Sequence, residues 1–109
     1  MRSFHDYNIA KLQDTQDAAL YLTESLIEFK EDNNIDSFLK ALKDVTEAQG
    51  GIGVLSKKTS LNRQNLYRVL SAERQPKVET LGAILDGLGL QLTIIPKKAD
   101  LENDSHKSN

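Results

Sequence analysis

The 109-residue chain has no cysteine, no tryptophan and two prolines. Without cysteine it can form no disulfide framework, no thiolate nucleophile and no zinc–thiolate site, and a reducing compartment is allowed. No apolar run approaches the roughly 20 residues that a membrane helix needs, and residues 1–30 lack the basic-then-apolar order of a signal peptide. The sequence therefore predicts a cytoplasmic globular protein with no membrane partner.

Aromatic residues are also scarce, with three Phe and three Tyr. The core must therefore come mostly from Leu, Ile, Val and Ala, and the length allows one domain, which we expect over residues 1–96. Domains of this size are marginally stable. Self-association is expected for that reason.

The net charge of −2 hides an uneven distribution along the chain. Residues 1–48 hold five Lys or Arg and ten Asp or Glu, whereas residues 49–77 hold six Lys or Arg and a single acidic residue, Glu73. The excess positive charge thus lies in one stretch of 29 residues. From charge alone, a solvated surface explains this as well as a polyanion-binding site does.

Apolar residues recur every three to four positions between capping residues, and this pattern predicts five helices. The expected helices cover about residues 15–30, 36–50, 52–58, 63–72 and 76–88. The expected N-caps of three of them are Thr15, Asp36 and Asn62. The buried face of the first is expected to contain Ala19, Leu22, Leu26 and Phe29. The first two helices carry acidic outer faces.

Residues 90–95, Leu-Gln-Leu-Thr-Ile-Ile, have the composition of a β-strand and end at Pro96. A single strand cannot satisfy its own backbone, and no other segment alternates well enough to pair with it. We expect it to pair with a second copy about a two-fold axis or to extend a sheet in another protein, unless it merely packs on the helices. The residues proposed for this contact are Leu90, Leu92, Ile94 and Ile95.

The expected fold class is thus an all-α, five-helix domain with one C-terminal β-strand at a dimer interface. Residues 1–14 are predicted to form an extended arm that packs against the body. Residues 97–109 are polar and mixed in charge, which predicts a disordered tail.

Residues 52–72 combine two short predicted helices, a three-residue turn and the basic stretch, which predicts a helix-turn-helix. Asn62 is a good N-cap for the second helix, and Leu61 can pack against Leu66 as a hydrophobic staple. The side chains expected to lock the two helices together are Leu55, Leu61, Leu66, Val69 and Leu70.

Arg63, Gln64, Tyr67, Arg68 and Ser71 then point outward from the second helix. Arg suits guanine, Gln suits adenine, and Tyr can contact phosphate or a thymine methyl group. The alternative for each residue is an ordinary role in solubility, in the core or in capping. The remaining cations carry charge without base-edge geometry, so we assign them to phosphates. The full candidate DNA-binding set is Lys57, Lys58, Ser60, Asn62, Arg63, Gln64, Tyr67, Arg68, Arg74 and Lys77.

Other kinds of site find little support. The glycines at 50–53, followed by Lys57 and Lys58, partly resemble a phosphate-binding loop, but no Gly directly precedes a Lys and no strand comes before. His5 and His106 lie near the two ends without a spaced set of ligands, which argues against a metal site. No nucleophile is paired with a base. We expect no enzyme and no cofactor.

Residues 51–71, GIGVLSKKTSLNRQNLYRVLS, resemble the helix-turn-helix core of the prokaryotic addiction-module antidote proteins, a lambda-repressor/Cro-like group of antitoxins. Similar pieces extend the resemblance to about residues 4–96. It implies a lambda-repressor-like DNA-binding protein that neutralises a toxin of the RelE/ParE kind and represses their shared promoter. The recognition role falls by position on Asn62, Arg63, Gln64 and Arg68. Ser60 departs from the Gly often found at its turn position, where a left-handed backbone can be required.

The prediction is therefore a homodimeric antitoxin and repressor that reads a palindromic operator in double-stranded DNA, with half-sites about 34 Å apart. A regulator from a prophage or plasmid, acting without a toxin, is the nearest alternative. The alternative of another class is a protein-binding module that uses the acidic helices or residues 90–95 and does not bind DNA.

Overall fold

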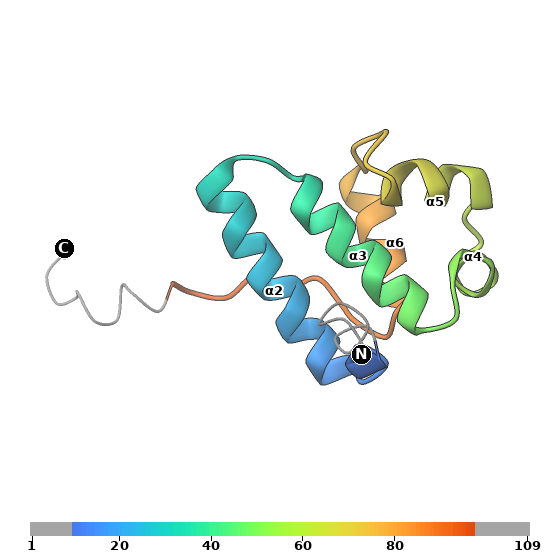
Figure 1. Cartoon of the computed structure of the whole chain (residues 1–109), viewed down its shortest axis with the longest axis horizontal. Coiled ribbons are helices and arrows are strands. Elements are labelled where there is room, and N and C mark those ends of the chain that lie inside the picture. The colour runs from blue at the N-terminus through green and yellow to red at the C-terminus, as the bar shows by residue number, and fades with distance from the viewer. Residues whose placement is uncertain (1–9, 98–109) are drawn as a thin grey trace, which may run out of the picture.

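The computed structural model describes residues 10–97, and this part of the chain is all-helical (Figure 1). Its helices are α2 (Thr15–Asp32), α3 (Asp36–Ala48), α4 (Ile52–Thr59), α5 (Arg63–Leu70) and α6 (Val78–Gly87). All five predicted helices are confirmed. Most of the predicted arm, the predicted tail, His5 and His106 lie outside the described residues.

The first two helices form a hairpin whose ends differ in detail from the prediction. Asp14, not Thr15, caps α2, because its Oδ1 accepts from the backbone N–H groups of Gln16 at 2.7 Å and Asp17 at 3.2 Å. Asp36 is likewise the first residue of α3 and not its cap, and its own N–H donates to Asn34 Oδ1 at 2.9 Å. The N-cap positions, Asp14 and Ile35, therefore each lie one residue before the predicted one, and Ile35 makes no side-chain capping hydrogen bond.

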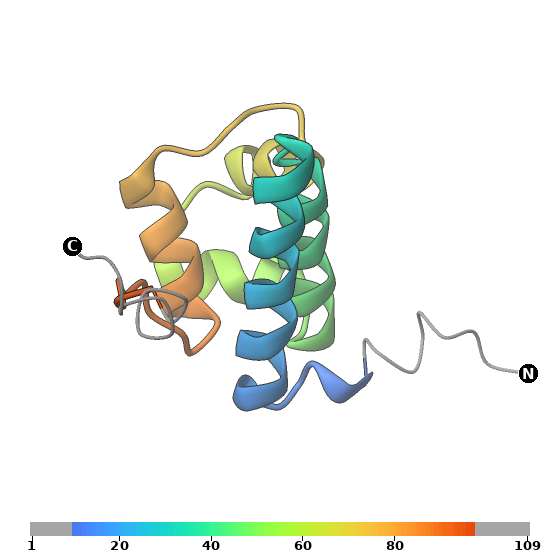
Figure 2. The same cartoon turned by 90° about the vertical axis from the view of Figure 1, so that its left-hand side faces the viewer.

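Helix α3 lies between α2 and the pair α4 and α5 and packs against all three, while α6 packs against α4 on the other flank of the molecule (Figures 1 and 2). Its apolar side chains Phe38, Leu39, Leu42 and Val45 are buried, as the spacing predicted. The other large buried side chains are Leu12, Leu22, Leu55, Leu66, Val69, Leu70, Ile84, Leu85 and Leu88. One core thus joins the acidic hairpin to the basic helices.

Close packing of α6 on α4 depends on Gly87. A methyl group at this position would lie 2.5 Å from Thr59 Cγ2 and 2.7 Å from Leu55 Cδ1, which are distances that packed atoms do not tolerate. Helix α6 can therefore approach α4 because residue 87 has no side chain.

The predicted inner face of α2 is confirmed at Leu22 and wrong at Ala19 and Leu26. The buried residues are Ala18, Leu22 and Ser25, whereas Ala19 and Leu26 are exposed and Phe29 is half-buried. Apolar residues lie on several sides of this helix, so their spacing alone did not fix which side faces α3. A large apolar surface of α2 is consequently left in solvent.

The predicted C-terminal strand is not formed in the described chain. Residues 90–97 have no regular secondary structure, because a strand needs a paired neighbour and none lies opposite within residues 10–97. Leu92 approaches α6, with its Cδ1 atom 3.8 Å from where a methyl group on Gly82 would lie. Ile94 and Ile95 remain 96% and 70% exposed.

At the other end, the described part of the arm packs against the body but is not extended. Ala10 and Lys11 are helical, and Leu12 is buried in the core. Within residues 10–97, no helix combines the length and the hydropathy that crossing a membrane requires.

Candidate nucleic-acid interface

Helices α4 and α5 are joined by a three-residue turn that hydroxyl groups of α4 hold in place. Ser56 Oγ donates to the Leu61 carbonyl oxygen at 2.7 Å. Thr59 Oγ1 donates to the Leu55 carbonyl oxygen at 2.9 Å and accepts from the Leu61 N–H at 3.1 Å. Ser60 adopts the left-handed conformation, with φ of 64°. The predicted helix-turn-helix geometry is thus present and is stabilised by local polar contacts.

The start of α5 is capped as predicted. Asn62 Oδ1 accepts from the backbone N–H groups of Gln64 at 2.8 Å and Asn65 at 3.1 Å. Leu61 packs against the core that contains the buried Leu66, consistent with the predicted staple. These contacts fix the direction in which α5 leaves the turn.

Helix α5 ends at Leu70, two residues earlier than predicted. Ala72 adopts a left-handed conformation with φ of 64°, and the Glu73 N–H donates to the Arg68 carbonyl oxygen at 2.8 Å. This is the hydrogen bond of a Schellman ending, usually built around glycine. Ala adopts this geometry only at a cost, and glycine is the residue that usually signals it. Because no glycine stands here, the sequence did not indicate that α5 ends at Leu70.

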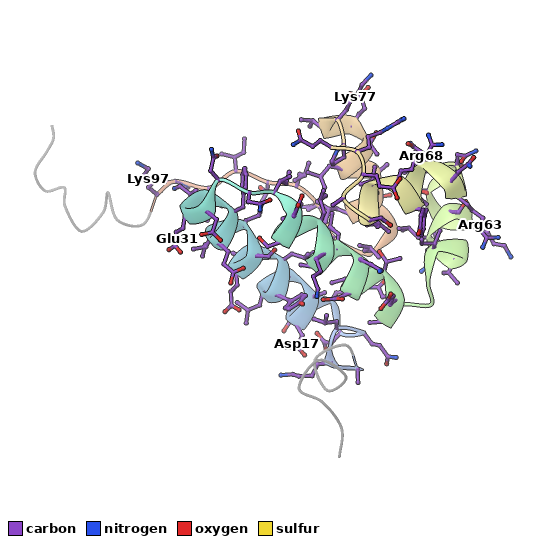
Figure 3. All side chains as sticks on the ribbon, turned by 45° about the horizontal axis from the view of Figure 1, so that its top comes forward. Asp17, Glu31, Arg63, Arg68, Lys77 and Lys97 are labelled. Atoms are coloured by element: carbon purple, nitrogen blue, oxygen red, sulfur yellow. The ribbon has the colours of Figure 1, made fainter. Side chains whose placement is uncertain are left out.

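The outer side of α5 carries the predicted base-contacting side chains. Arg63, Gln64, Tyr67 and Arg68 are exposed, while Ser71 is half-buried. Arg63 and Arg68 extend away from the body from α5 (Figure 3). The exposed face therefore presents two guanidinium groups, an amide and a phenol on one rigid helix.

The surrounding basic side chains are also exposed, and their charge is uncompensated. Among the residues described, no salt bridge involves any cation between positions 49 and 77. Lys77 lies on the same side of the molecule as Arg68 and Arg63, whereas Glu31 and Asp17 lie toward the other end (Figure 3). The charge asymmetry of the sequence is thus also an asymmetry in space.

Lys58 is set somewhat apart from the other cations. Its Cβ atom lies 3.9 Å from where a methyl group on Gly87 would be, so the residue stands beside α6. It lines an open pocket with Ala48, Gln49 and Asp86. The structure thus brings Lys58 to the α4–α6 junction and not to the exposed face of α5.

Two residues of this site were not identified from the sequence. Asn65 Oδ1 accepts from Arg74 Nη1 at 3.4 Å, which ties the segment after α5 back to the helix. Gly53 lies under Arg63, since a methyl group there would be 3.8 Å from Arg63 Nη2. No sequence pattern signals either contact, because the first depends on how the chain turns back after α5 and the second on how α5 crosses α4.

The model of one protein family, described as probable addiction module antidote protein, matches residues 3–96. The chain belongs to this family. The match agrees with the predicted resemblance in both kind and extent. No curated protein and no solved structure matches the chain significantly.

Membership of an antidote family implies a cognate toxin as a partner. Within residues 10–97, no group of three or more His, Cys, Asp or Glu side chains is placed to hold a metal ion.

Proposed function

We propose that this antidote protein is a DNA-binding antitoxin that represses its own operon and neutralises the toxin encoded there. The observation that carries the proposal is α5, a capped helix with exposed Arg63, Gln64, Tyr67 and Arg68 inside an uncompensated basic surface. In this proposal the protein acts by binding and not by catalysis, and it works in the cytoplasm, where its operator would lie. The resemblance favours a small toxin of the RelE/ParE kind.

In this proposal α5 enters the major groove of double-stranded DNA. Arg63 and Arg68 each offer two donors for guanine O6 and N7, Gln64 matches adenine N6 and N7, and Tyr67 contacts a thymine methyl group or a phosphate. Ser60 and Asn62 lie in the turn before α5 and would approach the DNA backbone there. The phosphate contacts that raise affinity without selecting sequence are assigned to Lys57, Lys58, Arg74 and Lys77.

The acidic hairpin supports this orientation. Helix α2 lies on the far side of α3 from α5 in Figure 1, and its carboxylates repel phosphate. Only the side that carries α4 and α5 can therefore approach DNA closely, which also limits indiscriminate binding.

A homodimer is part of the proposal. The Leu90 N–H already donates to the Leu85 carbonyl oxygen at 2.8 Å, but within the described chain no backbone hydrogen bond involves residues 91–97, which include the exposed Leu92, Ile94 and Ile95. Pairing with the same segment of a second copy would satisfy their backbone groups and present two recognition helices to a palindrome, with half-sites about 34 Å apart. Thr93→Pro, which removes a backbone donor, is expected to shift sedimentation from dimer to monomer.

DNA binding is tested by retardation of the chain's own promoter fragment. Arg63→Ala/Arg68→Ala removes two bidentate donors, so we expect at least about thirtyfold weaker binding, from roughly 1–3 kcal/mol per lost pair. Lys40→Ala/Lys43→Ala removes the same charge from exposed positions of α3 and is the matched control, expected to change affinity less than about twofold. Absence of retardation by the wild-type protein at about 50 mM salt favours the protein-binding module instead.

The antitoxin is separated from a regulator without a toxin by a growth assay. If the adjoining gene arrests growth and this chain restores it, the antitoxin role stands. If no adjoining gene arrests growth while the promoter fragment is still retarded, the chain is a lone regulator.

A further inference from the structure

The outer face of α2 exposes apolar side chains, whereas a surface helix usually carries polar residues on the face that points away from the core. Leu20, Ile27 and Leu26 are 59%, 53% and 43% exposed. Leu20 and Ile27 are seven residues apart and therefore lie on one side of the helix, opposite the buried Ala18 and Leu22. Thr23 and Glu24 lie between Leu20 and Ile27 on the same side, so the two side chains are separate apolar points about two turns apart. Large apolar side chains exposed on one side of a helix are a usual feature of contact surfaces.

Carboxylates flank this apolar strip. Helix α2 contains five acidic residues and one basic residue, Lys30. The acidic residues are Asp17, Glu24, Glu28, Glu31 and Asp32. An apolar centre with a charged rim is the usual layout of a protein interface, and the sign of the rim selects a basic partner.

The surface is preformed, because α2 is fixed to the rest of the fold. Tyr21 Oη donates to Asp44 Oδ2 of α3 at 2.6 Å, and Asp44 is itself buried. With 18 residues at about 1.5 Å each, the helix offers a rigid ridge about 27 Å long. A partner that docks here does not have to order a flexible segment, which removes one cost of binding.

We propose that the outer face of α2, centred on Leu20 and Ile27, is the surface that binds the toxin, and that the toxin meets it with a basic, partly apolar patch. This inference rests on the proposed antitoxin function. A second copy of this chain is a poor occupant, because two such helices would bring ten carboxylates and two lysines together. A basic protein gains from the same charges.

The position of α2 has a further consequence. It lies on the far side of α3 from α5 (Figures 1 and 3). A toxin bound to α2 leaves Arg63 and Arg68 free, so toxin and operator bind the antidote at the same time.

The experiment titrates the protein encoded beside this chain into the purified full-length antidote by calorimetry. Leu20→Lys/Ile27→Lys puts two positive charges into the apolar centre, and we expect at least about tenfold weaker binding, as for interface hot spots. Val54→Lys/Val78→Lys makes the same change at two exposed valines outside α2 and is the matched control, expected to bind like wild type.

Far-UV circular dichroism and promoter retardation by each variant show that it is folded. A milder pair, Glu24→Gln/Glu31→Gln, leaves the apolar strip intact and is expected to weaken binding and reduce its salt dependence. In a gel, antidote and toxin together should retard the promoter fragment further than antidote alone.

Undiminished toxin binding by both the Leu20→Lys/Ile27→Lys and Glu24→Gln/Glu31→Gln variants overturns the assignment to α2 and leaves the antitoxin function standing. Equal weakening by the valine control also overturns it. If the wild-type chain does not bind its neighbour at all, the neutralising function fails and this inference fails with it. Retardation by the wild-type chain then still reports separately on DNA binding.

Discussion

The acidic hairpin and the basic helix-turn-helix are built in different ways. Helices α2 and α3 have 18 and 13 residues, and α3 buries eight of its side chains. Helices α4 and α5 have eight residues each, and together they bury four. Isolated helices this short are marginal in water, so their stability must come from elsewhere.

In the basic half it comes from local polar contacts, from α6 and from the packing of α4 and α5 on α3. The Asn62 cap, the Ser56 and Thr59 hydroxyl groups and the packing of α6 on α4 replace the broad apolar contact of the hairpin. Substitutions in the hairpin should therefore affect stability and leave DNA binding intact. Substitutions in the basic half should affect both.

The largest effect is expected at Gly87, where α6 supports α4. Gly87→Ala places a methyl group within 3 Å of Thr59 and Leu55 side-chain atoms, and overpacking of this kind costs about 3 kcal/mol. Urea denaturation measures this loss. Gly82→Ala is the matched control, because its methyl group would make an ordinary 3.8 Å contact with Leu92 while helix propensity improves. Equal destabilisation by both variants would contradict the role of close packing at Gly87.

The next effect is expected in the hairpin, at Tyr21. Tyr21→Phe leaves the buried Asp44 carboxylate without its hydroxyl donor, which should lower the free energy of unfolding by about 2 kcal/mol. Promoter retardation by the folded variant should match wild type. If this variant loses DNA affinity, a change in the acidic hairpin alters the basic helix-turn-helix, and the two halves are not independent.

The same residue predicts a dependence on pH. Burial, the hydrogen bond to Asp44 and the negative charges of Asp44 and Glu28 raise the pKa of Tyr21 well above its ordinary value near 10. Since the folded state favours the protonated phenol, this stabilisation is present below pH 10 and is lost as the pH rises further. The difference in unfolding free energy between wild type and Tyr21→Phe should therefore shrink above about pH 10. A constant difference from pH 8 to 11 would argue against this origin.

Two helix caps offer a direct comparison of the halves. Asn62→Ala and Asp14→Ala each remove a side-chain oxygen that accepts two backbone N–H groups, so each should cost about 1 kcal/mol. Only Asn62→Ala should also weaken promoter retardation, because α5 then frays at the turn that aims it. Equal DNA affinity of the two variants, measured well below their unfolding temperatures, would show that the cap does not position α5.

The sequence predicted the helices and the helix-turn-helix well because their signals are local. The Asn62 cap, the spacing of Leu66, Val69 and Leu70 and the run of cations all lie within one short segment. Each of these signals depends on neighbours in the chain and not on distant packing.

The caps of α2 and α3 and the end of α5 were misplaced by one or two residues, and the larger errors arose where distant contacts decide the outcome. The buried face of α2 depends on how it docks against α3, and there Ser25 is buried while Leu26 is exposed. The strand predicted at residues 90–95 needs a partner that a single copy does not supply. The ion pair of Lys11 with Asp17 and the contact of Asn65 with Arg74 likewise have no counterpart in composition.

The smallest expected effect concerns the turn that aims α5. Ser60 holds φ of 64°, a conformation that costs an L-residue about 1 kcal/mol and that glycine adopts freely. Ser60→Gly should therefore stabilise the fold by about 0.5 kcal/mol, since part of the gain is offset by the greater freedom of glycine in the unfolded chain. Ser71→Gly is the matched control, because Ser71 has φ of −93° and gains nothing from glycine. Thermal unfolding measures both variants. If the Ser60→Gly protein melts at a lower temperature than wild type, the serine side chain stabilises the turn by more than its left-handed backbone destabilises it.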